Sequence, residues 1–315
     1  MSLSVFLELV ELRTKLASVL PFLVGTLFAY AYFGEFSPVN TALFFAAMLL
    51  FDMTTTAIDN LVHYKKAKDA QYAATVNVIG RAKLDPRRVL HLILGMLGAA
   101  VVLGLILAWR TDWLLLLIGA ACFAVGIFYT FGPLPLAQLP LGEVFSGVTM
   151  GLGIPFIAVF VNVDSARLLH LALAWPNLTL EGDYIALIAL ALICVTPMAT
   201  IANIMLANNL ADLREDRANH RTTLPMYLGE DRAKALWRGL TYAGYFALVA
   251  AVLFGAVSWP ALVAVLTVPI AAKNAKRFAA KPDKRKTFPL AIANLVIENG
   301  GLAIGLALSL LVKVG

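Results

Sequence analysis

Long apolar segments, separated by short charged ones, recur along this chain and constrain its fold more than any other feature. A membrane-spanning helix needs roughly 20 mainly apolar residues, because the hydrocarbon core of a bilayer is about 30 Å thick. We therefore expect an all-α, polytopic membrane protein with about nine transmembrane helices. The expected spans are residues 16–33, 40–61, 89–109, 112–131, 143–163, 184–207, 235–257, 259–272 and 288–312.

The composition excludes an ordinary soluble enzyme. Hydrophobic residues make up 61% of the chain and charged residues 14%, whereas a soluble domain has about 25% charged residues. The two cysteines, Cys122 and Cys194, lie within apolar segments, which argues against a disulfide framework. The net charge is +6, and the basic residues lie between the apolar segments. We therefore expect these residues to face anionic lipid and not nucleic acid.

The distribution of Lys and Arg predicts the orientation in the membrane. With nine spans and a cytoplasmic N-terminus, 22 of the 25 Lys and Arg residues fall on the cytoplasmic side. Cytoplasmic loops carry such an excess in membrane proteins. We expect a multi-pass protein of the cytoplasmic (inner) membrane, with its C-terminus outside.

Two segments that follow the second and sixth spans begin alike. Residues 59–63 read DNLVH and residues 208–212 read NNLAD, and each leads into a charged stretch. We call residues 59–69 the first acidic segment and residues 208–225 the second acidic segment. They lie four spans apart, so they share one face of the membrane. This echo predicts a single transmembrane domain, 1–315, made of pseudo-repeat halves at about 1–142 and 143–315.

The second acidic segment has the composition of a magnesium–phosphate site. Asp212 and Asp216 are four residues apart and would share one face of a continuing helix, close to the amide of Asn208. Oxygen ligands of this kind suit Mg²⁺, above all when a phosphate supplies the remaining ligands. The alternative is a solvated loop that anchors topology. Arginines that could bind the phosphate lie in the same segment: Arg214, Arg217 and Arg221.

The first acidic segment is a weaker candidate for a metal site. Its acids are Asp59 and Asp69, with Asn60 as a neutral oxygen ligand and Lys65 as a cation for phosphate. His63 is aligned with Asp212 in the repeat, and a histidine there could hydrogen-bond phosphate or carry a proton. Taken alone, this segment could equally be a topology anchor.

Polar groups at the membrane interface and within the spans form the next layer. Arg13 and Lys15, at the start of the first span, could reach phosphate or extend to lipid headgroups. Tyr129 ends the fourth span and could contact substrate or belong to an interfacial aromatic belt. Asp52 and Glu298 lie inside spans, where they either line a pocket or hydrogen-bond between helices.

Together these motifs resemble the UbiA superfamily of intramembrane prenyltransferases. Besides the second acidic segment with its RTTLP ending at 221–225, the resemblance rests on ELRTKLAS at 11–18 and YTFGPLP at 129–135. The chain is most similar to the branch that prenylates 1,4-dihydroxy-2-naphthoate in menaquinone biosynthesis. The resemblance implies a helical bundle around a central cavity that opens sideways to lipid. It also implies two acidic segments that hold Mg²⁺ for the diphosphate of a polyprenyl donor, and an aromatic acceptor.

The resemblance assigns roles to residues of both segments. Expected metal ligands are Asn60, Asn208, Asp212 and Asp216. The expected catalytic set is Asp59, Asn60, His63, Asp69, Asp212 and Asp216. Groups expected to bind diphosphate or acceptor are Arg13, Lys15, Lys65, Tyr129, Asn208, Arg214, Arg217 and Arg221. The chain departs from the family pattern at His63, where an acid is usual, and at Ala211, where an arginine is common. These departures keep two alternatives open: another acceptor such as 4-hydroxybenzoate, or a non-enzymatic lipid-handling or transport protein.

Overall fold

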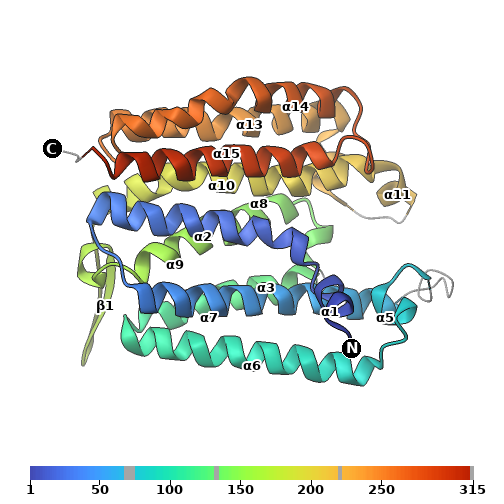
Figure 1. The fold of residues 1–315 in the computed structure, drawn as a ribbon, viewed down its shortest axis with the longest axis horizontal. Helices are drawn as coiled ribbons and strands as arrows, with labels where there is room; N and C mark the ends of the chain where they lie inside the picture. The colour runs from blue at the N-terminus through green and yellow to red at the C-terminus, as the bar shows by residue number, and fades with distance from the viewer. Residues whose placement is uncertain (67–74, 131–134, 219–221, 313–315) are drawn as a thin grey trace.

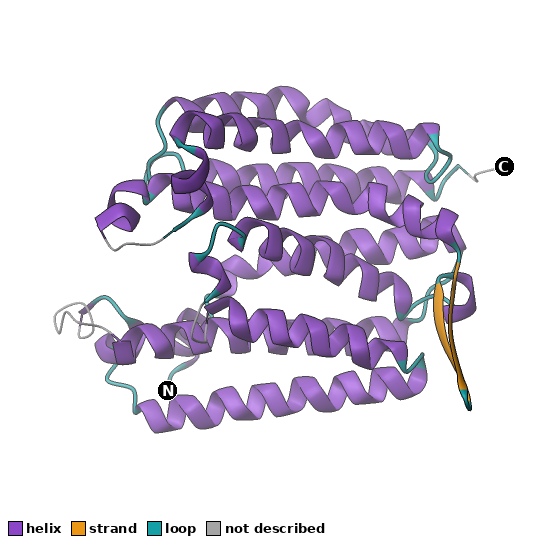
Figure 2. Cartoon of the chain, turned by 180° about the vertical axis from the view of Figure 1, so that it is seen from behind, coloured by secondary structure: helices purple, strands orange, loops and turns teal. Residues whose placement is uncertain are grey.

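The computed structural model describes residues 1–66, 75–130, 135–218 and 222–312, and helices dominate them (Figure 1; Figure 2). The long helices lie side by side in one bundle. They are α2 (Leu16–Phe28) with η2 (Ala29–Phe33), α3 (Pro38–Lys66), α6 (Pro86–Arg110), α7 (Leu114–Thr130), α8 (Gly142–Ser146) with η4 (Gly147–Gly153) and α9 (Ile154–Phe160), α10 (Tyr184–Ala211), α13 (Glu230–Leu253), η6 (Trp259–Thr267) with α14 (Val268–Ala280), and α15 (Pro289–Ser309). Short helices connect them: α1 (Leu3–Leu9), η1 (Leu12–Lys15), α5 (Val78–Arg81), η3 (Leu136–Gln138), η5 (Ser165–Arg167), α11 (Leu213–Ala218) and α12 (Leu224–Leu228).

The helices confirm the predicted all-α, polytopic membrane class. Among the described residues, 7 helical segments are long and apolar enough to cross a membrane, and Leu114–Tyr129 is a shorter apolar helix. The η6–α14 segment covers the predicted span that carries Pro260 and Pro269. The number nine and the side of the N-terminus stay predictions, as does the division into two repeats.

Local sequence signals explain where the long helices begin. Asp85 caps α6 by accepting a hydrogen bond from the amide of Arg87 at 2.9 Å, and Pro86 takes the first helical position. Asp183 caps α10 through the amide of Ile185 at 2.8 Å. Acidic caps satisfy backbone N–H groups that a helix leaves unpaired at its start.

A two-stranded hairpin lies between α9 and α10, in the connection between the predicted spans 143–163 and 184–207. Strand β1 (Leu169–Ala174) pairs antiparallel with β2 (Asn177–Gly182). The hairpin lies at one end of the bundle, opposite α1, α5 and α11 (Figure 1). His170 of β1 contacts the carboxylate of Asp112, which ties the hairpin to the start of α7. The pattern of apolar spans did not predict the strands, because six-residue strands are too short to be distinguished beside long apolar helices.

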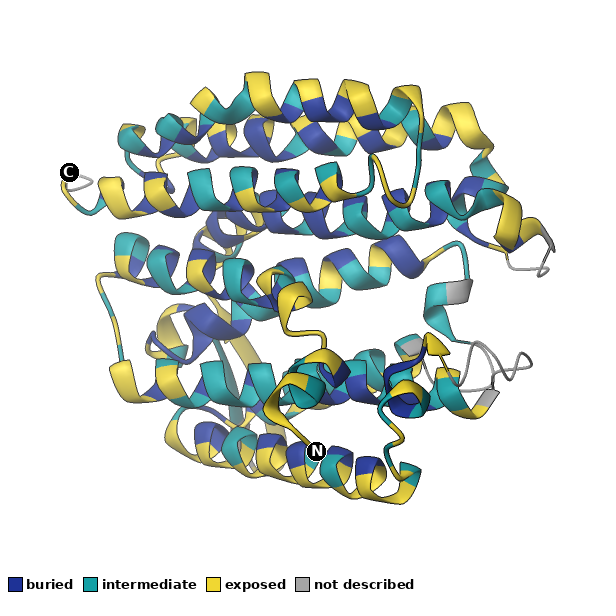
Figure 3. Ribbon diagram, turned by 45° about the vertical axis from the view of Figure 1, so that its right-hand side comes forward, coloured by how far each residue is buried: buried dark blue, intermediate teal, exposed yellow. Residues whose placement is uncertain are grey.

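Close helix contacts position the centre of the bundle. A Cβ atom added to Gly151 of η4 would lie 2.4 Å from the Cα of Met198 in α10, so only glycine permits this approach. Small residues at helix contacts are the usual means of packing helices in membranes. Buried residues from α2, α9, α10 and α15 form one continuous core, while exposed residues cover the outside of the bundle (Figure 3).

The helices α3 and α10 end at the same end of the bundle, beside α1, α5 and α11 (Figure 1). We call this the motif end, because both acidic segments start there. The fold therefore brings the two segments to one face, as their spacing in the sequence predicted.

Candidate functional site

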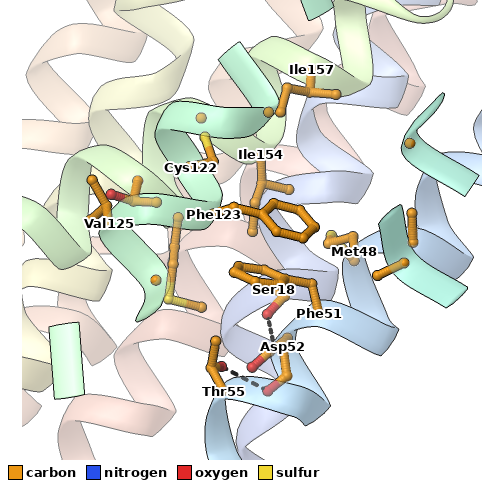
Figure 4. A pocket seen from close by; sticks show the side chains of 18 of the residues that line it. Ser18, Met48, Phe51, Asp52, Thr55, Cys122, Phe123, Val125, Ile154 and Ile157 are labelled. Atoms are coloured by element: carbon orange, nitrogen blue, oxygen red, sulfur yellow. Dashed lines mark hydrogen bonds between the residues drawn. The ribbon is translucent and has the colours of Figure 1, made fainter. Parts of the chain in front are cut away.

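A cavity of about 590 Å³ lies between α2, α3, α6, α7 and the α8–η4–α9 segment. Figure 4 shows its apolar walls, with Met48 and Phe51 of α3 opposite Phe123 of α7 and Ile154 of α9. The rings of Phe51 and Phe123 stack with their centroids 3.9 Å apart. The volume is in the range of about 300–1,000 Å³ that small-molecule sites have.

Polar groups gather in one part of the cavity wall. Asp52, Thr55, Thr56 and Asp59 follow one another along α3, and Glu11 joins them from the segment between α1 and η1. Partial removal of the Glu11 carboxyl from water raises its pKa, and the nearby charge of Asp59 raises it further. The cavity is therefore acidic where α3 approaches the motif end, and largely apolar elsewhere.

Lys15 and Asp52 form an ion pair at this polar part of the cavity wall. The Lys15 ammonium lies 2.6 Å from Asp52 Oδ1 and 2.6 Å from the hydroxyl of Thr56, and the residue is only 3% exposed. Ser18 donates a hydrogen bond to the other carboxylate oxygen of Asp52 (Figure 4). Lys15 thus contacts Asp52, which lines the cavity. A contact between Lys15 and the substrate stays a prediction.

The first acidic segment is described up to residue 66. The Asp59 carboxylate lies 3.4 Å from Nε2 of His63, one helical turn further on. The side-chain amide of Asn60 donates to the carbonyl of Leu9 at 3.1 Å. Lys65 is exposed, and Asp69 lies outside the described residues. Of the predicted residues of this segment, Asp59 lines the cavity.

The second acidic segment begins in the last turn of α10. Helix α10 ends at Ala211 with Asp212 as its C-cap, and a separate helix, α11, begins at Leu213. The carbonyl of Asp212 accepts a hydrogen bond from the amide of Asp216 at 2.8 Å. The two acids are therefore one helical turn apart, although the sixth helix does not run unbroken through the segment. Lys284 contacts both Asn208 Oδ1 and Asp212 Oδ2, the latter at 2.5 Å. Asp216 is buried, and the hydroxyl of Thr223 lies 3.5 Å from its carboxylate.

The remaining predicted residues are distributed over the motif end and the cavity. Arg13, Arg214 and Arg217 are exposed, and Arg221 lies outside the described residues. Tyr129 lines the cavity, with its hydroxyl 3.5 Å from the carbonyl of Gly142.

The two intramembrane acids have different surroundings. Asp52 lines the cavity, which was one of the two expectations for this residue. Glu298 is 2% exposed and does not belong to the cavity wall. Its carboxylate oxygens have no hydrogen-bond partner among the described residues.

Two residues of the site had no predicted role. Lys284 lies in the connection between α14 and α15. In the sequence it belongs to a run of cations, KPDKRK at 281–286, which is equally typical of a topology signal, so nothing singled it out. Glu143, at the start of α8, accepts a hydrogen bond from the side-chain amide of Asn209 at 2.8 Å. Both contacts join elements far apart in the sequence, which a motif search does not detect.

The arrangement suits a cation with oxygen ligands better than a transition metal. No group of three or more His, Cys, Asp or Glu side chains that could hold a metal ion occurs within the described ranges. Asn208 Oδ1 and Asp212 Oδ2 nevertheless converge on one cationic atom, Nζ of Lys284. Of the described side chains, those of Asn208, Asp212 and Asp216 do not line the cavity, so the two acidic segments border it unequally.

Comparisons with known proteins agree with this geometry. The sequence model of the UbiA prenyltransferase family matches residues 18–296. A curated relative, the 1,4-dihydroxy-2-naphthoate octaprenyltransferase of Bacillus subtilis (strain 168), is 30% identical over 275 residues, which cover 86% of this chain and 81% of that protein.

Two solved structures share the fold. The apo structure of a UbiA homolog from Aeropyrum pernix K1 aligns with a TM-score of 0.68 and 18% identity, covering 93% of this chain and 98% of that one. A UbiA homolog from Archaeoglobus fulgidus, solved bound to GPP and Mg²⁺, aligns with a TM-score of 0.62 and 12% identity, covering 96% and 98%. These alignments confirm the predicted fold.

Proposed function

Because this chain belongs to the UbiA prenyltransferase family and is a membrane prenyltransferase, we propose that it joins a polyprenyl chain to an aromatic acceptor. The donor is a polyprenyl diphosphate, and the acceptor is 1,4-dihydroxy-2-naphthoate, as in menaquinone biosynthesis. The observation that carries the reaction is the cavity, whose wall carries carboxylates in one part and is largely apolar elsewhere. With a divalent cation between the carboxylates and the phosphates, it matches an amphiphile with an anionic head. The Bacillus subtilis relative supports the choice of acceptor.

The donor set of the second acidic segment fits Mg²⁺. An amide oxygen and a carboxylate oxygen, one helical turn apart, already face a single positive charge, and oxygen ligands with phosphate are what Mg²⁺ prefers. Asn208 and Asp212 would hold the ion, with Asp216 behind them and Asn60 on the first acidic segment. When bound, Mg²⁺ neutralises diphosphate and makes it a better leaving group.

The protein's own residues supply binding and exclusion of water. The exposed arginines Arg214 and Arg217, together with Arg221, would face the phosphates, since guanidinium groups bind phosphate in a bidentate way. The stacked rings of Phe51 and Phe123 form part of the apolar wall. Such a wall keeps water from the allylic carbon as its bond to the diphosphate oxygen breaks.

The reaction balances without a further co-reactant. The allylic C–O bond of the donor breaks, and diphosphate leaves with the electron pair. The ring carbon that bears the carboxylate forms the new C–C bond with the allylic carbon. In the naphthoate acceptor the ring carboxylate leaves as carbon dioxide, so the ring recovers its aromatic character. The products are diphosphate, carbon dioxide and the prenylated naphthalenediol.

The same proposal places the protein in the cytoplasmic membrane with its motif end toward the cytoplasm. The strong excess of Lys and Arg on that side supports this orientation, since cytoplasmic loops carry such an excess. Donor and acceptor head groups would then meet the acidic segments from the cytoplasmic side, while the prenyl chain stays among the helices.

The test uses the purified protein in detergent with geranylgeranyl diphosphate, 1,4-dihydroxy-2-naphthoate and Mg²⁺, with mass spectrometry of the products. A parallel reaction contains 4-hydroxybenzoate, and a control contains EDTA. We expect metal-dependent product with the naphthoate alone. Product with only 4-hydroxybenzoate would change the acceptor, and the absence of product with either acceptor in folded protein would refute the proposal. Asp216→Asn should be inactive, whereas Glu215→Gln, one residue away and exposed, should retain activity.

A further inference from the structure

The connection between α14 and α15 presents one lysine to the second acidic segment. Within this connection, Asp283 Oδ1 accepts hydrogen bonds from the amides of Arg285 at 2.9 Å and Lys286 at 2.8 Å. The amide of Asp283 donates to the hydroxyl of Thr287 at 2.9 Å. These bonds close a tight turn around Lys284, so the side chain starts from a fixed backbone.

The Lys284 ammonium lies where the proposed metal site expects a cation. It contacts Asn208 Oδ1 and Asp212 Oδ2 together, and its side chain is 47% exposed, against 23% for that of Asp212. Its Nζ also lies 5.7 Å from the ring centroid of Phe288. The ammonium is therefore partly shielded and yet accessible from the motif end.

The position of Asp212 explains why a cation is needed there. Asp212 ends α10, a helix of 28 residues. The C-terminus of a helix carries the negative end of its dipole, which disfavours a carboxylate and favours a cation nearby. With no metal bound, an ammonium group that pairs with Asp212 offsets this unfavourable charge.

We propose that Lys284 is the resident counter-cation of the second acidic segment, and that a divalent metal displaces its ammonium from Asn208 and Asp212. This inference rests on the proposed function, because it assumes that the segment binds the metal. In the metal-free protein the Lys284 ammonium occupies the point on which Asn208 Oδ1 and Asp212 Oδ2 converge. Metal and ammonium compete for the same two oxygen atoms.

Competition gives a prediction with a distinctive sign. A pair between partly exposed charges contributes about 0.2–1 kcal/mol, and binding to a site that is only partly free is weakened by the occupied fraction. Removing the ammonium should therefore strengthen metal binding without donor by roughly two- to sixfold. A residue that merely stabilised the loop would, when replaced, leave metal affinity unchanged or weaken it.

The experiment measures Mn²⁺ binding to the purified full-length protein, without donor or acceptor, by electron paramagnetic resonance of the free ion, with Mg²⁺ as a competitor. Lys284→Met removes the ammonium, and Lys284→Arg keeps the charge. Lys286→Met is the matched control, because Lys286 is exposed in the same turn and its hydrogen bond to Asp283 comes from the backbone. Asp212→Asn should abolish the effect of Lys284→Met. A thermal melt of each variant without metal establishes that it is folded.

We expect tighter Mn²⁺ binding by Lys284→Met alone, with Lys286→Met and Lys284→Arg close to the wild type. Equal or weaker binding by Lys284→Met, while the wild type binds Mn²⁺ and forms product, would overturn the inference and leave the proposed function intact. If neither the wild type nor Lys284→Met binds Mn²⁺, both the inference and the metal site of the proposed function are refuted. Should Lys284→Met not fold, Lys284→Gln provides the same comparison.

Discussion

Replacing Asp52 by asparagine leaves the ammonium of Lys15 buried without its carboxylate partner. In the structure Lys15 Nζ lies 2.6 Å from Asp52 Oδ1, and the side chains of Lys15 and Asp52 are 4% and 17% exposed. Removing one partner of a buried pair costs about 3–5 kcal/mol. Lys15 keeps two other oxygen neighbours, the hydroxyl of Thr56 at 2.6 Å and the carbonyl of Asp52 at 3.0 Å. We therefore expect the free energy of unfolding to fall by an amount near the lower end of this range, about 3 kcal/mol.

A thermal melt of purified protein in detergent measures this loss. At about 2 °C per kcal/mol, the midpoint of Asp52→Asn should fall by roughly 6 °C. The double variant Lys15→Met/Asp52→Leu removes both charges and should melt above Asp52→Asn, because no uncompensated charge remains. Ser18→Ala, which removes one hydrogen bond to the same carboxylate, is the control and should cost about 1.5 kcal/mol, the lower end for a bond to a charged group.

Two results would refute this reasoning. One is an Asp52→Asn variant that melts with the wild type, which would mean that the pair contributes nothing. The other is a double variant whose loss equals the sum of the losses from Lys15→Met and Asp52→Leu. Residues that contact each other should show an interaction energy in such a cycle.

Further predictions concern the acidic segments, the cavity and the helix contacts. Asp212→Ala should lower the rate of prenyl transfer by at least ~10²-fold with the fold preserved, as followed by product formation; a fully active variant would exclude Asp212 from the site. Gly151→Leu should cost more than ~3 kcal/mol, because overpacking at a backbone contact has no room to relax, and a melt unchanged from the wild type would contradict this. The folded-state pKa of Glu11 is raised above its ordinary value of 4.5, so the folded state binds the proton more tightly and loses stability as pH rises through the raised pKa. Glu11→Gln should therefore melt above the wild type at about pH 8 and close to it near pH 4.5; a difference of the opposite sign would refute the raised pKa.

The sequence predicted the long helices well, for a physical reason. Apolar length is a signal that each span carries by itself, so the predicted 16–33 coincides with α2 and η2. The hairpin at Leu169–Gly182 was missed because its strands are short and lie between two strong helical signals. The helix ends at Lys66 and Ala211 extend beyond the predicted spans, since helices continue past the apolar stretch into the charged segments.

The site was predictable in composition but less so in its contacts. The spacing of Asp212 and Asp216 predicted one face of a continuing helix, whereas α10 ends at Ala211 and Asp216 lies on the separate helix α11. No pattern in the sequence connects Lys284 with Asp212, because they meet through the packing of α10 and the connection before α15. Lys15 illustrates the converse: its position at a span end indicated an accessible cation, and a carboxylate 37 residues away draws it into the interior.

The cavity wall has a consequence for how the enzyme meets its substrates. Val101 and Leu105 of α6 line the cavity and are 42% and 51% exposed. A cavity of about 590 Å³ suits a drug-sized ligand, so we expect the long prenyl chain of the proposed donor to extend beyond it into the bilayer. Such a substrate arrives by diffusion in two dimensions. We expect the rate to follow the mole fraction of donor in the lipid or detergent phase, so that adding inert lipid at a fixed total donor concentration slows the reaction by dilution within the membrane.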